Sequence, residues 1–265
     1  MPQAAPHQLV DKRLNRRIGP IDRLHERARY SAAMTFPLLF IPGFMQPAEA
    51  WGDVANRLEP PTILLDHREH SFQGRLEEIA AAGQRALLVG YSLGGRLALR
   101  AALRDPERYA GLVTVGVTAG IEDPAARAAR AEADERLASW IEAAPIEDVV
   151  AVWERQPLFA DQSDALVEQQ RAGRLAQDPT ELARLLRSAG QGVLEPVWHE
   201  LLTFRLPVLA IAGARDDGYV RAAKKIADTA PNARAHIVEN AGHAPQLQQP
   251  AEVASAIAGF RSGLD

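Results

Sequence analysis

Short apolar runs alternate along the chain with segments in which apolar residues recur every third or fourth position. The first pattern predicts strands buried on both faces, and the second predicts helices with one apolar face. Strands are expected at residues 36–41, 62–65, 86–89, 112–117, 207–212 and 235–238. Helices are expected at residues 48–58, 75–82, 96–103, 219–229 and 251–260. This alternation predicts an α/β fold with a mostly parallel sheet of about six strands, flanked by helices.

Residues 118–204 interrupt the alternation, because they contain helical patterns and no good strand pattern. Helices are expected to begin near Asp123, Ile146, Leu166 and Pro179. An insertion of this kind predicts a helical cap over the carboxyl ends of the strands. We therefore expect a core formed by residues 34–117 and 205–265, with a cap at residues 118–204.

Residues 1–33 differ from the rest of the chain, because basic residues outnumber acidic ones and few residues are strongly apolar. We expect a mobile basic extension, or an upstream start with Met34 opening the folded part. A short helix docked on the surface is an alternative. A transit peptide is disfavoured by the acidic residues and the weak amphipathic pattern.

Ser92 lies between an apolar run and a helical pattern, in the segment Val89-Gly90-Tyr91-Ser92-Leu93-Gly94-Gly95. Gly-x-Ser-x-Gly between a buried strand and a helix is typical of a nucleophile elbow. The turn is so tight that a Cβ at either flanking position would collide with its neighbours, and glycine removes that atom. The sequence therefore predicts Ser92 as a nucleophile and the Leu93 N–H as an oxyanion donor.

A serine hydroxyl needs a base to take its proton, and the base needs a carboxylate to orient it. His243 follows the last expected strand and lies downstream of an acid-bearing loop, which predicts it as the base. His67 and His70 follow the second expected strand and are the competitors for a role in the site.

The acid loop contains two adjacent aspartates, Asp216 and Asp217, after the expected strand at residues 207–212. The spacing Gly213-x-x-Asp216 favours Asp216 as the orienting acid. Asp217 is then expected to cap the helix that begins near Tyr219.

A second oxyanion donor is expected from the loop that follows residues 36–41. Phe44, after Pro42-Gly43, is the candidate. The alternative is an ordinary turn with an apolar plug.

Composition excludes several classes of function. Apolar residues make up 47% of the chain, charged residues 24%, and the net charge of −4 offers no basic surface for nucleic acid. The absence of cysteine excludes disulfides, thiolate catalysis and cysteine-bound metal. No metal-ligand spacing and no P-loop lysine occur, so no metal or cofactor is expected. No apolar run is long enough for a membrane span and no secretory signal is present, so a cytoplasmic protein is expected.

The elbow, the acid loop, the histidine loop and the helical insertion together resemble the α/β-hydrolase superfamily, from Met34 to the end of the chain. More narrowly, residues 90–96, 153–160, 190–192 and 213–216 resemble the 2-succinyl-6-hydroxy-2,4-cyclohexadiene-1-carboxylate synthases of menaquinone biosynthesis. This resemblance implies a cofactor-free lyase in which the serine–histidine–aspartate set takes a proton from the substrate, which then expels pyruvate.

The same resemblance implies a small, carboxylated substrate whose carboxylates are held by arginines. The matching residues are Arg96 beside the elbow, and Arg130 and Arg174 in the cap, with Tyr91 and Trp153 lining the pocket. A guanidinium binds a carboxylate through two parallel hydrogen bonds, which suits this role. For Arg130 and Arg174, a solvated helix face is the alternative.

Two segments depart from the synthase pattern. The chain has Pro42-Gly43-Phe44 where the family usually has His-Gly-Phe, and residues 66–70 (Asp-His-Arg-Glu-His) replace a usual Pro-Gly-His-Gly loop. Both segments border the expected oxyanion hole, so they bear on which substrate is accepted.

Two other functions remain open from the sequence. A carboxylesterase-type or C–C-bond hydrolase would use Ser92 to form an acyl-enzyme, with the same three residues. A non-catalytic ligand-binding module would be expected to have lost one of them, and all three are present. The oligomeric state, monomer or dimer, is open.

Overall fold

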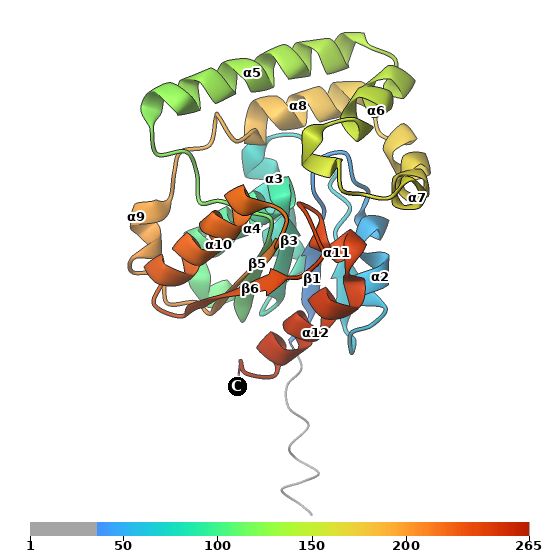
Figure 1. The fold of residues 1–265 in the computed structure, drawn as a ribbon. Helices are drawn as coiled ribbons and strands as arrows, with labels where there is room; N and C mark the ends of the chain where they lie inside the picture. Colours follow the sequence, from blue (N-terminus) through green and yellow to red (C-terminus); the bar gives the residue numbers. More distant parts are fainter. Residues whose placement is uncertain (1–35, 265) are drawn as a thin grey trace, which may run out of the picture. The chain divides into compact units, whose positions relative to one another are not determined.

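Six parallel strands form the sheet, in the order β2-β1-β3-β4-β5-β6 (Figure 1). The computed structural model describes residues 36–264, so the expected basic extension at residues 1–33 lies outside the described residues. The strands are β1 (Leu38–Ile41), β2 (Thr62–Leu64), β3 (Leu87–Tyr91), β4 (Gly111–Val115), β5 (Val208–Gly213) and β6 (Ala233–Val238). The α/β fold predicted from the sequence is confirmed, and every strand pair is parallel rather than most of them.

Different helices cover the two faces of the sheet. In β1, Leu39 and Ile41 belong to a buried cluster that also contains side chains of α3 (Phe72–Ala82), α4 (Ser92–Arg104) and α10 (Asp217–Thr229). Leu38 and Phe40 point the other way and belong to a second cluster, with side chains of α2 (Gly52–Ala55) and α12 (Pro250–Arg261). All four side chains are fully buried, and each burial stabilises the fold by about 1.5–3 kcal/mol. This two-sided burial explains why β1 reads as a continuous apolar run.

Six helical segments lie between β4 and β5 in the chain. They are α5 (Pro124–Ala143), α6 (Ile146–Glu154), the 3₁₀ turn η3 (Pro157–Phe159), α7 (Asp164–Leu175), α8 (Pro179–Ala189) and α9 (Trp198–Leu201). We call them the inserted helices. In Figure 1, α5 and α8 lie side by side at the top of the view, and α6 and α7 lie beside them.

Local side-chain caps fix where several of these helices begin. The Asp123 carboxylate accepts a hydrogen bond from the Ala126 N–H at 2.7 Å, and Pro124 occupies the first turn. The Asp178 carboxylate caps α8 in the same way, through the Thr180 N–H at 2.7 Å. The expected helix starts in this segment were therefore close to the observed ones.

Several expected boundaries differ from the structure, and three of the differences have a clear local cause. The helix expected at residues 48–58 is the 3₁₀ turn η1 (Ala48–Trp51) continued by α2, and only turns follow it before the Pro60-Pro61 pair. Helix α3 begins before residue 75, because the Ser71 hydroxyl accepts from the Gly74 N–H at 2.9 Å. Strand β4 ends at Val115, because Gly116 has a φ of 62° and leaves the extended conformation.

Two further short helices complete the described chain, the 3₁₀ turn η2 (Pro106–Arg108) and α11 (Pro245–Gln248). Within residues 36–264, no helix is both long and apolar enough to cross a membrane.

Candidate active site

Ser92 sits at the junction of β3 and α4 with a φ of 48°, a strained conformation that costs a non-glycine residue about 1–3 kcal/mol. Both flanking residues must be glycine, because a Cβ atom at either position would collide with nearby backbone atoms. A Cβ on Gly90 would lie 2.5 Å from the Gly95 Cα, and one on Gly94 would lie 2.1 Å from the Pro42 carbonyl oxygen. The tight strand–turn–helix predicted from the sequence therefore holds Ser92 at the carboxyl end of a central strand.

Three side chains far apart in the sequence form a continuous hydrogen-bonded chain. The Ser92 Oγ lies 3.3 Å from His243 Nε2, and His243 Nδ1 lies 2.8 Å from Asp216 Oδ2. His243 is only 3% exposed. With the Nδ1–H donating to the carboxylate, Nε2 is left as an acceptor for the serine hydroxyl, which is the tautomer that a general base requires.

Asp216 has a second function that the sequence analysis gave to its neighbour. Asp216 is the N-cap of α10, and its Oδ1 accepts from the Tyr219 N–H at 3.3 Å while Oδ2 faces His243. Asp217 is exposed and is the first residue of the helix. The expectation that Asp217 caps this helix is wrong, because one carboxylate has two oxygens and Asp216 uses both.

Aromatic rings surround the His243 imidazole. The ring centroids of Tyr219, Tyr91 and Phe159 lie 4.4, 5.4 and 6.3 Å from the imidazole centroid. Burial raises the pKa of the Tyr91 hydroxyl well above its ordinary value. Tyr91 was among the site residues expected from the sequence, whereas Tyr219 and Phe159 were not. Position 219 could have been noticed, since it is the third residue after Asp216, where an N-capped helix donates its N–H.

The two expected oxyanion donors, Phe44 and Leu93, are both buried. Leu93 is in the first turn of α4, where N–H groups have no partner within the helix. Phe44 lies in the loop after β1, directly before Met45, which has a φ of 60°. The Phe44 ring packs against Trp153 of α6, with centroids 5.1 Å apart. Within residues 36–264, neither N–H is bonded to an acceptor of the protein.

The three expected substrate-binding arginines have different surroundings. Arg174 is 2% exposed and pairs with Glu154 at 3.0 Å, and Arg130 pairs with Asp134 at 2.7 Å. Arg96 is 6% exposed, and its guanidinium makes one hydrogen bond within the described residues, a long one of 3.4 Å to the Ala189 carbonyl.

Burial is the main reason that the pKa of Arg96 lies below its ordinary value, and the positive charge of Arg130 also lowers it. Of the three guanidinium groups, Arg96 is the one without a carboxylate partner among residues 36–264. A buried cation of this kind is costly unless an anion joins it.

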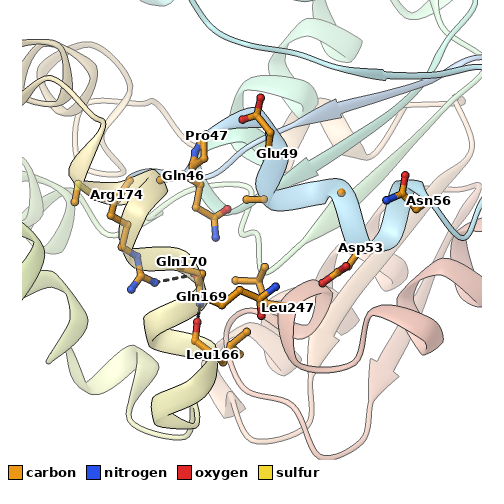
Figure 2. A pocket seen from close by; sticks show the side chains of 14 residues that line it. Gln46, Pro47, Glu49, Asp53, Asn56, Leu166, Gln169, Gln170, Arg174 and Leu247 are labelled. Carbon is orange, nitrogen blue, oxygen red and sulfur yellow. Dashed lines mark hydrogen bonds between the residues drawn. The ribbon is translucent and has the colours of Figure 1, made fainter.

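A cavity of about 300 Å³ separates α7 from η1 and α2 (Figure 2). Its walls carry Gln46, Glu49, Gln170 and Arg174, and the Arg174 guanidinium donates to the Gln170 side chain at 2.8 Å. Polar and apolar side chains share the lining of this cavity, and one expected substrate-binding arginine lies in its wall.

A second cavity, of about 250 Å³, adjoins Leu93 and is lined by His67, His70 and Arg75. The two histidines are engaged with carboxylates, His67 with Glu78 at 3.0 Å and His70 with Glu181. His243, not either of these, bonds the Ser92 hydroxyl. Within residues 36–264, no group of three metal-ligating side chains is arranged to hold a metal ion.

Burial, followed by the charge of Arg75, lowers the pKa of His67 from 6.5 to about 4. The unfolded chain therefore binds a proton at His67 between these pH values, and the folded chain does not. Folding stability is expected to fall by up to about 3 kcal/mol as pH drops from 6.5 to 4. Urea unfolding at pH 7, 6 and 5 measures this, and His67→Gln is expected to flatten the dependence. An equally steep dependence in that variant would contradict the prediction.

Residues 38–256 match the alpha/beta hydrolase family model. Since that match covers most of the chain, and the fold and the strand–turn–helix at Ser92 agree with it, the chain belongs to the alpha/beta hydrolase family.

Among curated relatives, the chain is 31% identical to the 2-succinyl-6-hydroxy-2,4-cyclohexadiene-1-carboxylate synthase of Enterobacter sp. (strain 638), over 84% of this chain and 91% of that protein. It is 34% identical to the putative synthase of the same name from Bacillus subtilis (strain 168), over 62% of this chain and 61% of the relative. Among solved structures, MenH from S. aureus superposes with a TM-score of 0.81 at 26% identity, covering 88% of this chain and 96% of that one. The resemblance stated from the sequence is confirmed.

Proposed function

We propose that this protein is a cofactor-free lyase of the 2-succinyl-6-hydroxy-2,4-cyclohexadiene-1-carboxylate synthase type, which eliminates pyruvate from a carboxylated cyclohexene substrate. The observation that carries the proposal is the hydrogen-bonded chain Ser92–His243–Asp216 together with Arg96, which lies one helical turn after Ser92 in α4 and is a buried cation without a carboxylate partner among the described residues. The relatives of this name support the reaction type.

In the proposed reaction, His243 takes the Ser92 proton, so that the serine oxygen can remove a proton from the substrate. Asp216, at 2.8 Å from Nδ1, stabilises the imidazolium that forms. The electron pair left on the substrate then forms a C=C bond as the C–O bond to the leaving group breaks. That group departs as the enolate of pyruvate, takes up the proton held by His243 and becomes pyruvate, which leaves Ser92 and His243 in their starting protonation states. Negative charge that develops on a substrate oxygen during this step is stabilised by the N–H groups of Leu93 and Phe44.

The inserted helices act as a cap in this proposal. Phe159 and Trp153 come from the insertion and pack on His243 and Phe44 of the core. This packing excludes water and strengthens the electrostatic interactions within the site. Arg96 binds one substrate carboxylate directly. Arg130 and Arg174 bind substrate carboxylates in place of Asp134 and Glu154, the side chains with which they pair in this structure.

The proposal is tested by supplying the purified protein with the menaquinone-pathway intermediate and, separately, with p-nitrophenyl esters. Release of pyruvate, read by a coupled lactate dehydrogenase assay, is the expected result. Fast ester turnover with a burst of p-nitrophenol and no pyruvate would instead identify a hydrolase that acts through an acyl-enzyme on Ser92.

Arg96→Met keeps the apolar stem and removes the charge. Methionine offers a substrate carboxylate neither the positive charge nor the paired hydrogen bonds of a guanidinium. We therefore expect kcat/KM to fall about 100- to 1,000-fold, mostly through a higher KM. Steady-state kinetics of pyruvate release measure the change. Arg104→Met, at an exposed position of the same helix, is the matched control. Equal KM values in the two variants would exclude Arg96 as the carboxylate ligand.

A further inference from the structure

The inserted segment contacts the loop that carries His243 at two points. The Phe159 ring faces the imidazole, at 6.3 Å between centroids. Two residues further on, the Asp161 carboxylate lies against Gly242, the residue before His243. A Cβ on Gly242 would come within 2.2 Å of Asp161 Oδ2, so the carboxylate occupies the space that any other residue's side chain would take.

Gln248, the last residue of α11, bonds to both segments. The oxygen of its side-chain amide bonds to the His243 loop, and the nitrogen bonds to the insertion. Its Oε1 accepts from the Gly242 N–H at 2.8 Å. Its Nε2 donates to Asp161, at 3.0 Å to Oδ2 and 3.4 Å to the backbone carbonyl. One side chain thereby joins the Ala241–Gly242 peptide group, which precedes His243, to Asp161 of the insertion, 87 positions from Gln248 in the sequence.

We propose that Gln248 and Asp161 are positioning residues, which hold the Gly242 peptide so that His243 reaches Ser92 only when the inserted helices are in place. The proposal rests on the proposed function, in which His243 is the base. It adds a link between the position of the insertion and the placement of that base.

This link affects the proposed reaction because the contact between Ser92 and His243 is easily lost. The Ser92–His243 distance of 3.3 Å is at the long end of the hydrogen-bonding range, so a small displacement of the imidazole breaks the contact. The Gly242 N–H belongs to the rigid Ala241–Gly242 peptide plane, and only the φ and ψ bonds of Gly242 separate that plane from His243. Loss of the Gln248 acceptor therefore frees this backbone to rotate and shifts His243, whereas loss of Asp161 leaves the Gln248 amide free to rotate.

Gln248→Ala and Asp161→Ala are expected to lower kcat for pyruvate release about 10-fold with KM within about twofold, because misplacement of a catalytic group by a fraction of an ångström slows the chemical step. Labelling of Ser92 by a fluorophosphonate is expected to slow by the same factor. Gln249→Ala is the matched control, because that neighbouring side chain does not cap α12 and makes no hydrogen bond to the described residues. All variants are first compared with the parent protein by thermal unfolding.

A double substitution that exchanges donor and acceptor between positions 248 and 161 tests the hydrogen bond itself, because it would not reverse a simple loss of packing. Gln248→Glu keeps the acceptor for Gly242 but places a second carboxylate against Asp161, so activity is expected to fall at least as far as in Gln248→Ala. Adding Asp161→Asn supplies an N–H donor to that carboxylate. The double variant is expected to recover labelling to within about threefold of the parent protein, since the two sites interact directly.

The outcomes separate the two proposals. A parent protein that the fluorophosphonate does not label at Ser92 would overturn the proposed function, and the positioning role with it. A labelled parent whose Gln248→Ala rate equals that of Gln249→Ala would overturn the positioning role alone. The same conclusion would follow if the double variant reacted no faster than Gln248→Glu.

Discussion

Ser92→Ala is expected to lower kcat for pyruvate release by about 10⁴- to 10⁶-fold, the loss typical of a removed nucleophile or base in such a set. In the proposed reaction the serine oxygen takes the substrate proton, and this oxygen lies 3.3 Å from His243 Nε2. Alanine fits the same tight turn, so the fold is expected to be unchanged. Pyruvate release at saturating substrate measures the effect.

His243→Ala is expected to give a loss of the same size, and the double variant Ser92→Ala/His243→Ala is expected to be no slower than either single one. The two losses are not expected to add, because when residues act as a unit, removal of either one abolishes the effect of both. Ser262→Ala, at an exposed position at the end of α12, is the control. A loss of only a few-fold in either single variant would show that the reaction does not use this pair.

Asp216→Asn is expected to lower kcat by about 10⁴-fold while leaving helix α10 intact. The asparagine oxygen can still accept the Tyr219 N–H and cap the helix, whereas the neutral amide cannot stabilise an imidazolium at Nδ1. The variant therefore separates the two functions of this one carboxylate. Circular dichroism and pyruvate kinetics on the same sample measure them.

Asp217→Asn is the matched control, because this exposed aspartate is adjacent to Asp216. Its activity is expected to stay within about twofold of the parent protein, as for most exposed substitutions away from a site. If Asp217→Asn proved the more damaging substitution, the assignment of the orienting acid would have to be reversed.

Much of the fold was predictable because its signals are local. A strand buried on both faces must be apolar throughout, as residues 87–91 are, and a helix on a sheet must repeat its apolar positions. The elbow was predictable for the same reason, since Gly90 and Gly94 are demanded by contacts a few residues away or on an adjacent strand. Helix limits were less predictable, because caps such as Ser71 depend on one hydrogen bond.

The site was predictable only in part. Chain order and loop position selected Ser92, His243 and Asp216, and the structure places them within hydrogen-bonding distance, while their catalytic roles stay predictions. The choice of Asp217 as a helix cap failed, because nothing local shows that one carboxylate serves two partners. The boundaries expected for the cap, residues 118–204, likewise stay a prediction.

The sequence by itself determined the order of strands and helices, the sharp turn at Ser92 and the side chains available for chemistry. Tertiary structure alone decided which arginine lacks a carboxylate partner among residues 36–264, which rings enclose His243 and how Gln248 joins Asp161 to Gly242. The physical reason is distance along the chain. Burial periodicity and turn geometry act over a few residues, whereas desolvation and hydrogen bonding between distant segments depend on how the packed helices bring those segments together.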